Sequence, residues 1–276
     1  MPWRKLMLAN LAGDVGSGRS SCAAAGLATP AGPVLARNLD HWPSRPLRDA
    51  TTVIEYERGG RLDFAAVGWP GFTSVTTAMS GEGFAIATIS VPVLGHIDPL
   101  GCPIGLLARD VLQSAPSFAA ALDVLSSTRL FAPAMILLIG RTNVQRVVIE
   151  RTTHSFAHRW PDGDEPLLAG DGFQVLPAPK PDHVPCALRA EEARTQAFSA
   201  ACANSGHSDL EFLSVLQNAM QDCTVCHAVM RPADAVMNAW IPEVARAAKR
   251  RNEAARHRNP GATRPGVDSI PHPAGH

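Results

Sequence analysis

The sequence predicts an α+β fold in which two antiparallel sheets stack face to face between outer helices, a four-layer αββα sandwich. Strand patterns come first, helical patterns follow, and this alternation then repeats along the chain. Stacked sheets with helices outside them bury the apolar faces of elements arranged in this order. With 276 residues and 46% hydrophobic content, the chain can form one such domain, which we expect to span residues 22–245.

The first elements form a hairpin that follows a short leader. Residues 6–12 are apolar and predict a strand, and residues 13–21 form a connector rich in glycine and serine. Turn-forming residues at 29–33 then separate two strand-like stretches at 20–26 and 34–40. If the turn centres on Ala31, the numbers of paired residues sum to about 62, which places Cys22 opposite Asp40.

An antiparallel meander and two helices follow. Alternating apolar residues and glycine-rich breaks predict strands at residues 52–56, 62–67, 72–79 and 84–91. Apolar residues at helical spacing predict helices at 103–113 and 117–125, and Ser117 is an expected N-cap.

The second half repeats this order of elements. We expect strands at 135–139, 146–151 and 155–160, and then a long surface loop at 161–185 that Leu167 and Leu168 interrupt. Helices are predicted at 186–202 and 210–220, and a last pair of strands at 224–230 and 235–240. Residues 246–276 are basic, proline-rich and glycine-rich, and we expect a disordered tail.

Charge and cysteine content exclude several classes of protein. With 25 basic and 25 acidic residues, no global field favours nucleic acid or an anionic membrane. The apolar stretch at 134–140 falls far short of the roughly 20 residues that span a bilayer. The first residues do not form a convincing signal peptide, and six cysteines in a chain of this length do not predict a disulfide framework, so we expect a cytoplasmic protein.

Cys22, Arg37 and Asp40 are the candidate reactive group. A thiol needs a base or a lowered pKa to act as a nucleophile, and neither carboxylate nor guanidinium accepts a proton readily at neutral pH. Cleavage between Ser21 and Cys22 would leave an α-amino group with a pKa of roughly 7.7 to 8 beside the sulfur. His41 is an alternative base that needs no cleavage, although adjacent strand residues point to opposite faces.

These residues resemble the N-terminal-nucleophile cysteine hydrolases of the acid ceramidase, N-acylethanolamine-hydrolysing acid amidase and penicillin-biosynthesis acyltransferase type. The resemblance rests on the apolar run at 6–11, on Cys22 and on the stretch from 32 to 40 that ends in Arg-Asn-Leu-Asp. It continues more faintly at 70–73, 83–87, 132–134, 147–151, 223–225 and 229–230. It implies the N-terminal-nucleophile fold and a precursor that cleaves itself before the cysteine.

The resemblance also implies roles for individual residues. Cys22 is the expected nucleophile, and Arg37 and Asp40 orient the freed amine and the substrate. Asp171 falls where the family has an asparagine that helps to bind the oxyanion, and we assign substrate binding to Asn38 and Arg189. The function that follows is a self-processing cysteine amidase or acyltransferase acting on linear amide or thioester bonds of a small N-acyl molecule, without a metal or organic cofactor.

Departures from the family motif support a second hypothesis. Ala23 replaces the usual threonine or serine, Gly170-Asp171 replaces Thr-Asn, and Ser90 falls near the place of an acidic residue. A carboxylate at 171 would repel a developing oxyanion unless it is protonated. The alternative is therefore a catalytically silent member that acts as a binding or interaction module.

Two further patterns suggest other chemistry. Residues 13–20 nearly fit a phosphate-binding loop, but Arg19 stands where that loop needs lysine, so a nucleotide-binding protein is a third hypothesis. Cys223, Cys226 and His227 match the haem c attachment pattern within a strand-like stretch. No second cysteine pair completes a zinc site, and we interpret these three residues as structural.

Overall fold

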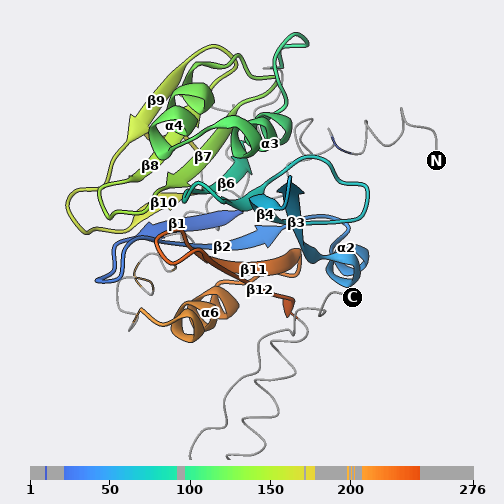
Figure 1. The fold of residues 1–276 in the computed structure, drawn as a ribbon, viewed down its shortest axis with the longest axis vertical. Coiled ribbons are helices and arrows are strands. Elements are labelled where there is room, and N and C mark those ends of the chain that lie inside the picture. Colours follow the sequence, from blue (N-terminus) through green and yellow to red (C-terminus); the bar gives the residue numbers. More distant parts are fainter. Residues whose placement is uncertain are drawn as a thin grey trace, which may run out of the picture. The chain divides into compact units, whose positions relative to one another are not determined.

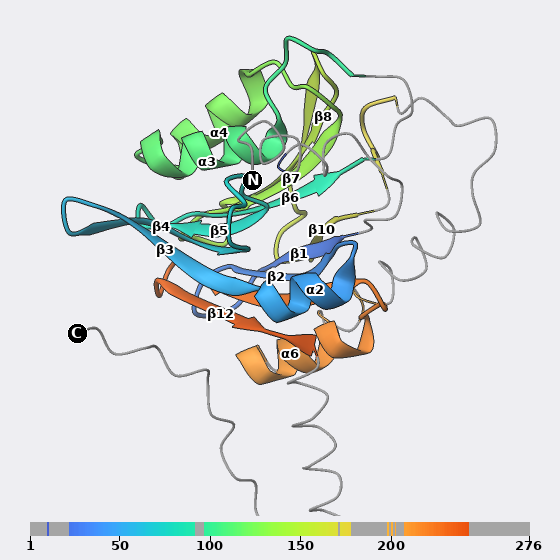
Figure 2. The ribbon, with the colours of Figure 1, turned by 90° about the vertical axis from the view of Figure 1, so that its right-hand side faces the viewer.

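The computed structural model describes residues 10, 22–91, 97–170, 172–177, 198, 200, 202 and 207–242. Within this part, two antiparallel sheets of five and seven strands lie face to face. Helices α3 and α4 cover the outer face of the larger sheet and α6 covers that of the smaller one (Figures 1 and 2). The predicted four-layer αββα sandwich is confirmed.

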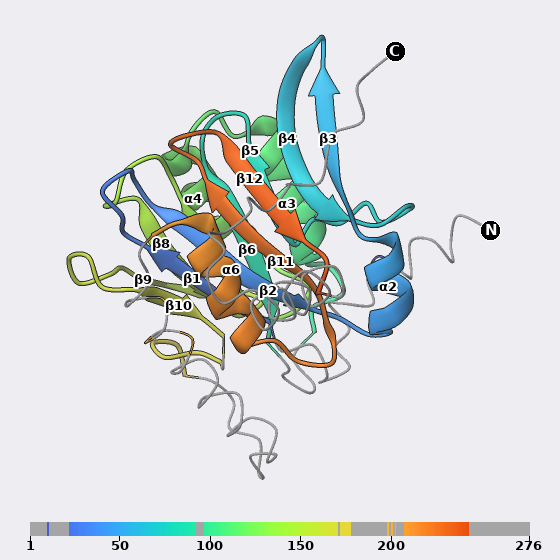
Figure 3. The same cartoon turned by 90° about the horizontal axis from the view of Figure 1, so that it is seen from below.

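The smaller sheet carries the predicted reactive residues. Its strands are, in spatial order, β10 (Leu167–Ala169), β1 (Ala23–Leu27), β2 (Val34–Asp40), β11 (Thr224–Arg231) and β12 (Val236–Trp240). Seen from below, α6 (Asp209–Asn218) lies across this sheet (Figure 3). The predicted hairpin at 20–40 therefore lies inside a sheet whose other strands come from residues 167–240, far along the chain.

The larger sheet is a meander in chain order. Its strands are β3 (Thr52–Arg58), β4 (Arg61–Gly68), β5 (Thr77–Ser80), β6 (Ala85–Ser90), β7 (Ala134–Ile139), β8 (Arg146–Arg151) and β9 (Phe156–Arg159). The helices outside it are α3 (Ile104–Ser114) and α4 (Phe118–Ser127). Ser117 caps α4 as predicted, because its side chain accepts a hydrogen bond from the Ala120 amide.

Three layers of buried apolar side chains hold the sandwich together. Leu35 and Leu39 pack against Leu137 and other residues of the facing sheet. The alternate residues of the same strands, such as Val34 and Ala36, face α6 instead. Both faces of the smaller sheet are therefore apolar, which explains why β1 and β2 read as continuous buried runs.

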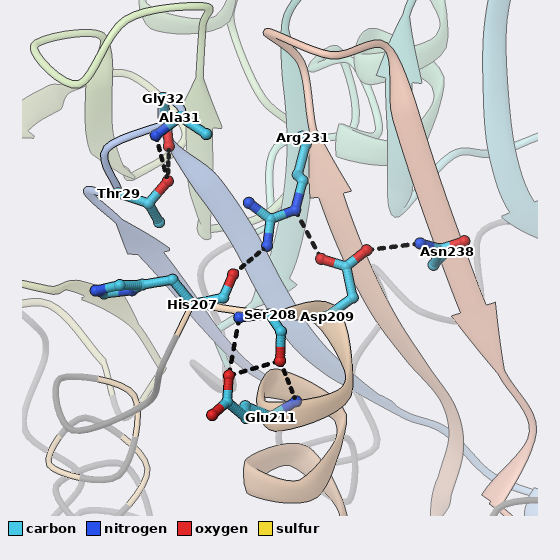
Figure 4. A network of polar contacts seen from close by, with 9 residues as sticks. All are labelled: Thr29, Ala31, Gly32, His207, Ser208, Asp209, Glu211, Arg231 and Asn238. Atoms are coloured by element: carbon cyan, nitrogen blue, oxygen red, sulfur yellow. Dashed lines mark hydrogen bonds and ion pairs between the residues drawn. The ribbon is translucent and has the colours of Figure 1, made fainter. Parts of the chain in front are cut away.

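The polar contacts of α6 attach it to the sheet (Figure 4). Ser208 and Glu211 form a capping box, in which each side chain accepts a hydrogen bond from the other residue's backbone amide. Asp209 accepts hydrogen bonds from Arg231 Nε at 2.6 Å and Asn238 Nδ2 at 2.7 Å. The predicted helix at 210–220 is thus confirmed, and its first turn is tied to β11 and β12.

Two predictions of secondary structure were wrong in part, and one helix was missed. The strand predicted at 72–79 begins only at Thr77, because Asn10 Oδ1 accepts hydrogen bonds from the Thr73 and Ser74 amides at 2.5 and 3.1 Å. Within the predicted loop at 161–185, Leu167–Ala169 pairs with β1 as strand β10. Helix α2 (Ser44–Ala50) was not predicted.

Several predictions fall mainly outside the described residues. Of the predicted strand at 6–12, only Asn10 is described, and it is helical. Of the predicted helix at 186–202, Phe198, Ala200 and Cys202 are described and are helical. The connector at 13–21 and the tail at 246–276 are outside. None of the helices that the structure describes has the length and hydropathy to cross a bilayer.

Candidate active site

Cys22 lies directly before β1 (Ala23–Leu27) and borders a small cavity of about 50 Å³. The residue is only 7% exposed, and its Sγ donates a hydrogen bond to the backbone oxygen of Asp40 at 3.6 Å. Burial raises the pKa of the Cys22 thiol, and the positive charge of Arg37 offsets part of this rise. The thiol is therefore predominantly protonated at neutral pH and needs a base to react.

The predicted register of the hairpin was wrong by one residue. Ala23 pairs with Asn38 and Leu27 with Val34, so Cys22 just precedes the paired residues and does not lie opposite Asp40. The turn is centred between Pro30 and Ala31, where the Gly32 amide donates to the Thr29 oxygen at 3.0 Å and Gly32 has a φ of 109°. The Cys22 sulfur nevertheless reaches Asp40.

Arg37 is a buried cation from the next strand. Its Nη1 donates hydrogen bonds to the backbone oxygens of Thr76 at 2.5 Å and Thr88 at 3.3 Å. Its Nε and Nη2 atoms are buried and are not paired with an oxygen atom of the described residues, and the guanidinium forms a side-chain hydrogen bond with Cys22 that lowers the pKa of the thiol. Arg37 is fully buried and is not among the residues that border the cavity, so in this structure it acts on Cys22 through its charge and this hydrogen bond.

The Asp40 side chain is held by a residue of the neighbouring strand β11 that the sequence did not indicate. Thr224 of β11 donates a hydrogen bond from Oγ1 to Asp40 Oδ1 at 2.5 Å, and both residues are fully buried. β11 is far from β2 in the sequence, and no local pattern pairs these two residues. The cue was a threonine at the first position of a strand whose next two residues are apolar.

The structure does not bring Asn38 to the cavity. Its Nδ2 donates to the Leu216 oxygen of α6 at 2.9 Å, and its Oδ1 lies 2.7 Å from Nδ1 of His227. These contacts lie on the face of the sheet that packs against α6. The described geometry therefore gives Asn38 a packing role between sheet and helix.

His41 does border the cavity together with Cys22. Its Nδ1 lies 2.9 Å from the Trp42 oxygen, and its ring contacts Trp69 edge-on with centroids 5.2 Å apart. A second base candidate is therefore present in the wall of the cavity that Cys22 borders.

The cavity has a mixed lining. Leu39, Phe72 and Ile104 provide apolar surface. The remaining wall includes four hydroxyl residues that the sequence analysis did not identify as one group, namely Ser74, Thr76, Thr88 and Ser90. Thr88 and Ser90 are two residues apart on β6 and share a face, which is the pattern that could have indicated them.

Several predicted site residues lie outside the described part of the chain. These are Ser21, Asp171 and Arg189. Gly170 is described and is buried directly after β10, whose last residue, Ala169, pairs with Ala24. The end of β10 therefore lies beside the start of β1, and β1 begins one residue after Cys22.

The competing haem and metal patterns begin at Cys223, directly before β11, and continue into that strand. Cys226 and His227 are fully buried, and burial raises the pKa of the Cys226 thiol to about 12. In the described ranges, no group of three or more His, Cys, Asp or Glu side chains is placed to hold a metal ion. The nucleotide-loop pattern at 13–20 lies outside those ranges.

The two stacked antiparallel sheets between helices match the N-terminal-nucleophile hydrolase fold. The chain is 30% identical over 190 residues to the N-acylethanolamine-hydrolyzing acid amidase of Mus musculus, covering 64% of this chain and 50% of that protein. It is therefore a distant homologue of this amidase and spans about half the length of the mammalian relatives that it matches.

Solved structures support the same fold. The Caenorhabditis elegans orthologue of that amidase matches with a TM-score of 0.66 and 18% identity over 80% of this chain and 99% of that one. A mutant of conjugated bile acid hydrolase from Clostridium perfringens matches with a TM-score of 0.50 and 15% identity over 79% and 89%. No protein-family model matches the chain. The predicted resemblance and fold class are confirmed.

Proposed function

We propose that the protein is a self-processing cysteine amidase or acyltransferase that acts on a small N-acyl molecule through Cys22. The observation that carries this proposal is the position of the Cys22 thiol, which borders a cavity and has Asp40 and Arg37 around it. The distant homology to an amidase supports the same class of reaction.

The first step is self-cleavage before Cys22: the Cys22 sulfur attacks the Ser21 carbonyl and loses its proton, the peptide C–N bond breaks as that nitrogen takes up a proton, and water then hydrolyses the resulting thioester to leave the Ser21 carboxylate. It frees the α-amino group of Cys22, whose pKa of roughly 7.7 to 8 suits a base at neutral pH. Asp40, fixed by Thr224, is the group proposed to orient this amine. The cleavage supplies the base that the buried thiol needs.

Acyl transfer then proceeds in two steps. The amine takes the thiol proton, the sulfur attacks the amide carbonyl, and the C–N bond breaks as the amine returns the proton to the leaving nitrogen. The positive charge of Arg37 beside Cys22, and backbone amides beside Asp171, are the proposed stabilisers of the oxyanion. Water, or another amine, attacks the thioester and releases the acyl group.

Acid quenching during turnover of an N-acyl amide tests this proposal. Peptide mapping is expected to find the acyl group on Cys22, and Cys22→Ala is expected to lower turnover by about a thousandfold or more. Cys226→Ala is the matched control, because that buried thiol does not border the cavity. Turnover that persists in Cys22→Ala, or an adduct on another residue, would contradict the proposal.

The alternative is a silent member that binds a small molecule without turning it over. The raised pKa of the Cys22 thiol and its hydrogen bond to the Asp40 backbone favour this candidate. The same experiment separates the two functions, because a silent member forms no acyl adduct. Ligand binding to wild type and to Cys22→Ala would then be equal.

A further inference from the structure

We infer that His41 is a second general base of this site, which activates the water or amine that releases the acyl group from Cys22. This inference rests on the proposed function and adds to it a catalytic residue for the second half of the reaction. It starts from the place of His41 beside the proposed nucleophile, from the hydrogen bond of its ring and from its partial exposure.

The backbone of His41 is joined directly to the group that Cys22 contacts. The Asp40 carbonyl that accepts the hydrogen bond from Cys22 Sγ, at 3.6 Å, is bonded to the His41 nitrogen. The His41 amide donates in turn to the Cys223 oxygen at 2.8 Å. β2 ends at Asp40, so the alternation of strand faces does not direct His41 away from Cys22, and both residues border the same cavity.

The hydrogen bond of the His41 ring determines which of its nitrogens can accept a proton. Nδ1 lies 2.9 Å from the Trp42 carbonyl oxygen, which can only accept, so Nδ1 carries the hydrogen. In the neutral ring Nε2 then has the lone pair. Among the residues that the structure describes, none forms a hydrogen bond with Nε2. Nε2 is therefore the atom that can act as a base.

A second contact orients the His41 ring. Trp69 meets it edge-on with ring centroids 5.2 Å apart. Trp69 is itself fixed, because it is buried and its Nε1 donates to the Leu47 oxygen at 3.1 Å and to Thr51 Oγ1 at 2.7 Å. A base that is held in one orientation is prepared for proton transfer before the acceptor arrives.

His41 and Cys22 differ in their access to solvent. Cys22 is only 7% exposed, whereas His41 is partly exposed. Asp40, which also borders the cavity, is fully buried and accepts a hydrogen bond from Thr224. Water or an amine that enters from solvent therefore meets His41 first, and histidine is the side chain that ordinarily changes its charge between pH 5 and pH 8.

The release step transfers one proton in each direction. His41 Nε2 takes a proton from a water molecule as the water oxygen attacks the thioester carbon. The C–S bond then breaks, the acyl group leaves as a carboxylic acid, and His41 returns the proton to the Cys22 sulfur. An amine acceptor follows the same steps and leaves as an amide.

Single-turnover reaction with a 4-nitrophenyl ester separates the two halves of the reaction. Nitrophenolate appearance measures acylation, and loss of acyl-Cys22 in acid-quenched samples, followed by intact mass, measures release. His41→Asn keeps an N–H donor for the Trp42 oxygen but has no base. We expect acylation within about threefold of wild type and release slower by about a hundredfold, a factor that general base catalysis supplies.

Added imidazole gives a readout that a merely structural role of His41 would not move. It supplies the missing base and should accelerate release from His41→Asn by about tenfold, with little effect on wild type. His154→Gln is the matched control, because His154 is exposed and does not border the cavity. This variant should keep both wild-type rates.

Two outcomes would overturn the inference and leave the proposed function intact. One is release from His41→Asn at the wild-type rate, and the other is acylation and release slowed by the same factor. His41→Gln provides the same measurement if His41→Asn does not fold. Absence of acyl-Cys22 in wild type would instead overturn the proposed function, and this inference with it.

Discussion

Cys22 and Cys226 are two buried thiols that differ in access to the cavity. Burial raises the pKa of both, and the charge of Arg37 opposes that rise in both. Only Cys22 borders the cavity. Access, together with a nearby base, therefore distinguishes the proposed nucleophile from a core cysteine.

Replacing Arg37 is expected to slow alkylation of Cys22 at pH 8. Arg37→Gln removes the positive charge that lowers the thiol pKa, so less thiolate is present. Iodoacetamide labelling followed by peptide mapping measures the rate, and Cys226 should remain unlabelled in both proteins. Arg61→Gln, at an exposed ion pair, is the control. An unchanged Cys22 rate in folded Arg37→Gln would contradict the electrostatic account.

Two buried threonines are expected to respond in opposite ways to replacement by valine. Thr224→Val removes a hydrogen bond to the Asp40 carboxyl and should lower the free energy of unfolding by about 1.5–3 kcal/mol. Thr77→Val removes a hydroxyl that has no partner in the described part and should be neutral or stabilising. Urea denaturation measures both changes, and equal losses would show that the Asp40 contact has no special value.

The sequence indicated the proposed reactive residues more readily than the residues that contact them. Cys22, Arg37 and Asp40 lie in one local hairpin, whose spacing is visible in the chain. Thr224 reaches Asp40 only because β11 pairs with β2, and such distant pairing leaves no local pattern. The register was missed by one residue because it depended on an assumed turn centre.

At the scale of elements, Glu150 of β8 anchors the segment that follows β10. The carboxylate is fully buried and accepts hydrogen bonds from Arg159 Nε and the Gln174 amide at 2.7 and 2.8 Å. It also accepts from the amides of Val175 and Leu176, each at 2.9 Å. The chain on the far side of Gly170 is thereby tied to the larger sheet.

Glu150→Gln is expected to destabilise the fold strongly. It leaves Arg159 without its buried counter-ion and at least one backbone amide without an acceptor, which should cost about 3–5 kcal/mol. Glu82→Gln breaks an exposed pair with Arg61 and should cost less than about 1 kcal/mol. Chemical denaturation of both variants compares them. Similar small losses would show that the Glu150 contacts do not hold this segment.

The elements themselves were predictable to different degrees. The meander and helices α3, α4 and α6 follow from local periodicity and caps. β10 was missed because three residues carry no periodic pattern and become a strand only by pairing with β1. The start of β5 at Thr77 was missed because the amides of Thr73 and Ser74 donate hydrogen bonds to Asn10, which is distant in sequence.

At the scale of the described domain, contacts between layers combine packing with hydrogen bonds. His158 of β9 lies 2.7 Å from Ser126 Oγ of α4, through its Nε2 atom. Burial lowers the pKa of this histidine below its ordinary value of 6.5. The layer contact is therefore sensitive to pH.

The free energy of unfolding is expected to fall as pH drops below about 6.5 because of His158. The unfolded chain binds a proton near that pH, whereas the folded chain binds it only at lower pH, so protonation favours unfolding. Between pH 7 and pH 5, the free energy of unfolding should fall by less in His158→Gln than in wild type. Denaturation at each pH measures the free energy of unfolding. Equal losses in the two proteins between pH 7 and pH 5 would contradict this assignment.

The layer order of the sandwich could be predicted, whereas the order of strands in the smaller sheet could not. Alternating blocks of strands and helices suffice to indicate two sheets between helices. The neighbours of the nucleophile hairpin are β10 and β11, which come from distant parts of the chain. The sequence therefore indicated the hairpin that carries the proposed nucleophile but not the cavity wall beside it.

Intact mass spectrometry of freshly purified wild type beside Cys22→Ala tests the central claim most directly. Wild type is expected to show cleavage between Ser21 and Cys22, with a fragment of residues 22–276, while Cys22→Ala remains a single chain. Wild type that keeps this bond intact, or cleavage that also occurs in Cys22→Ala, would contradict the account.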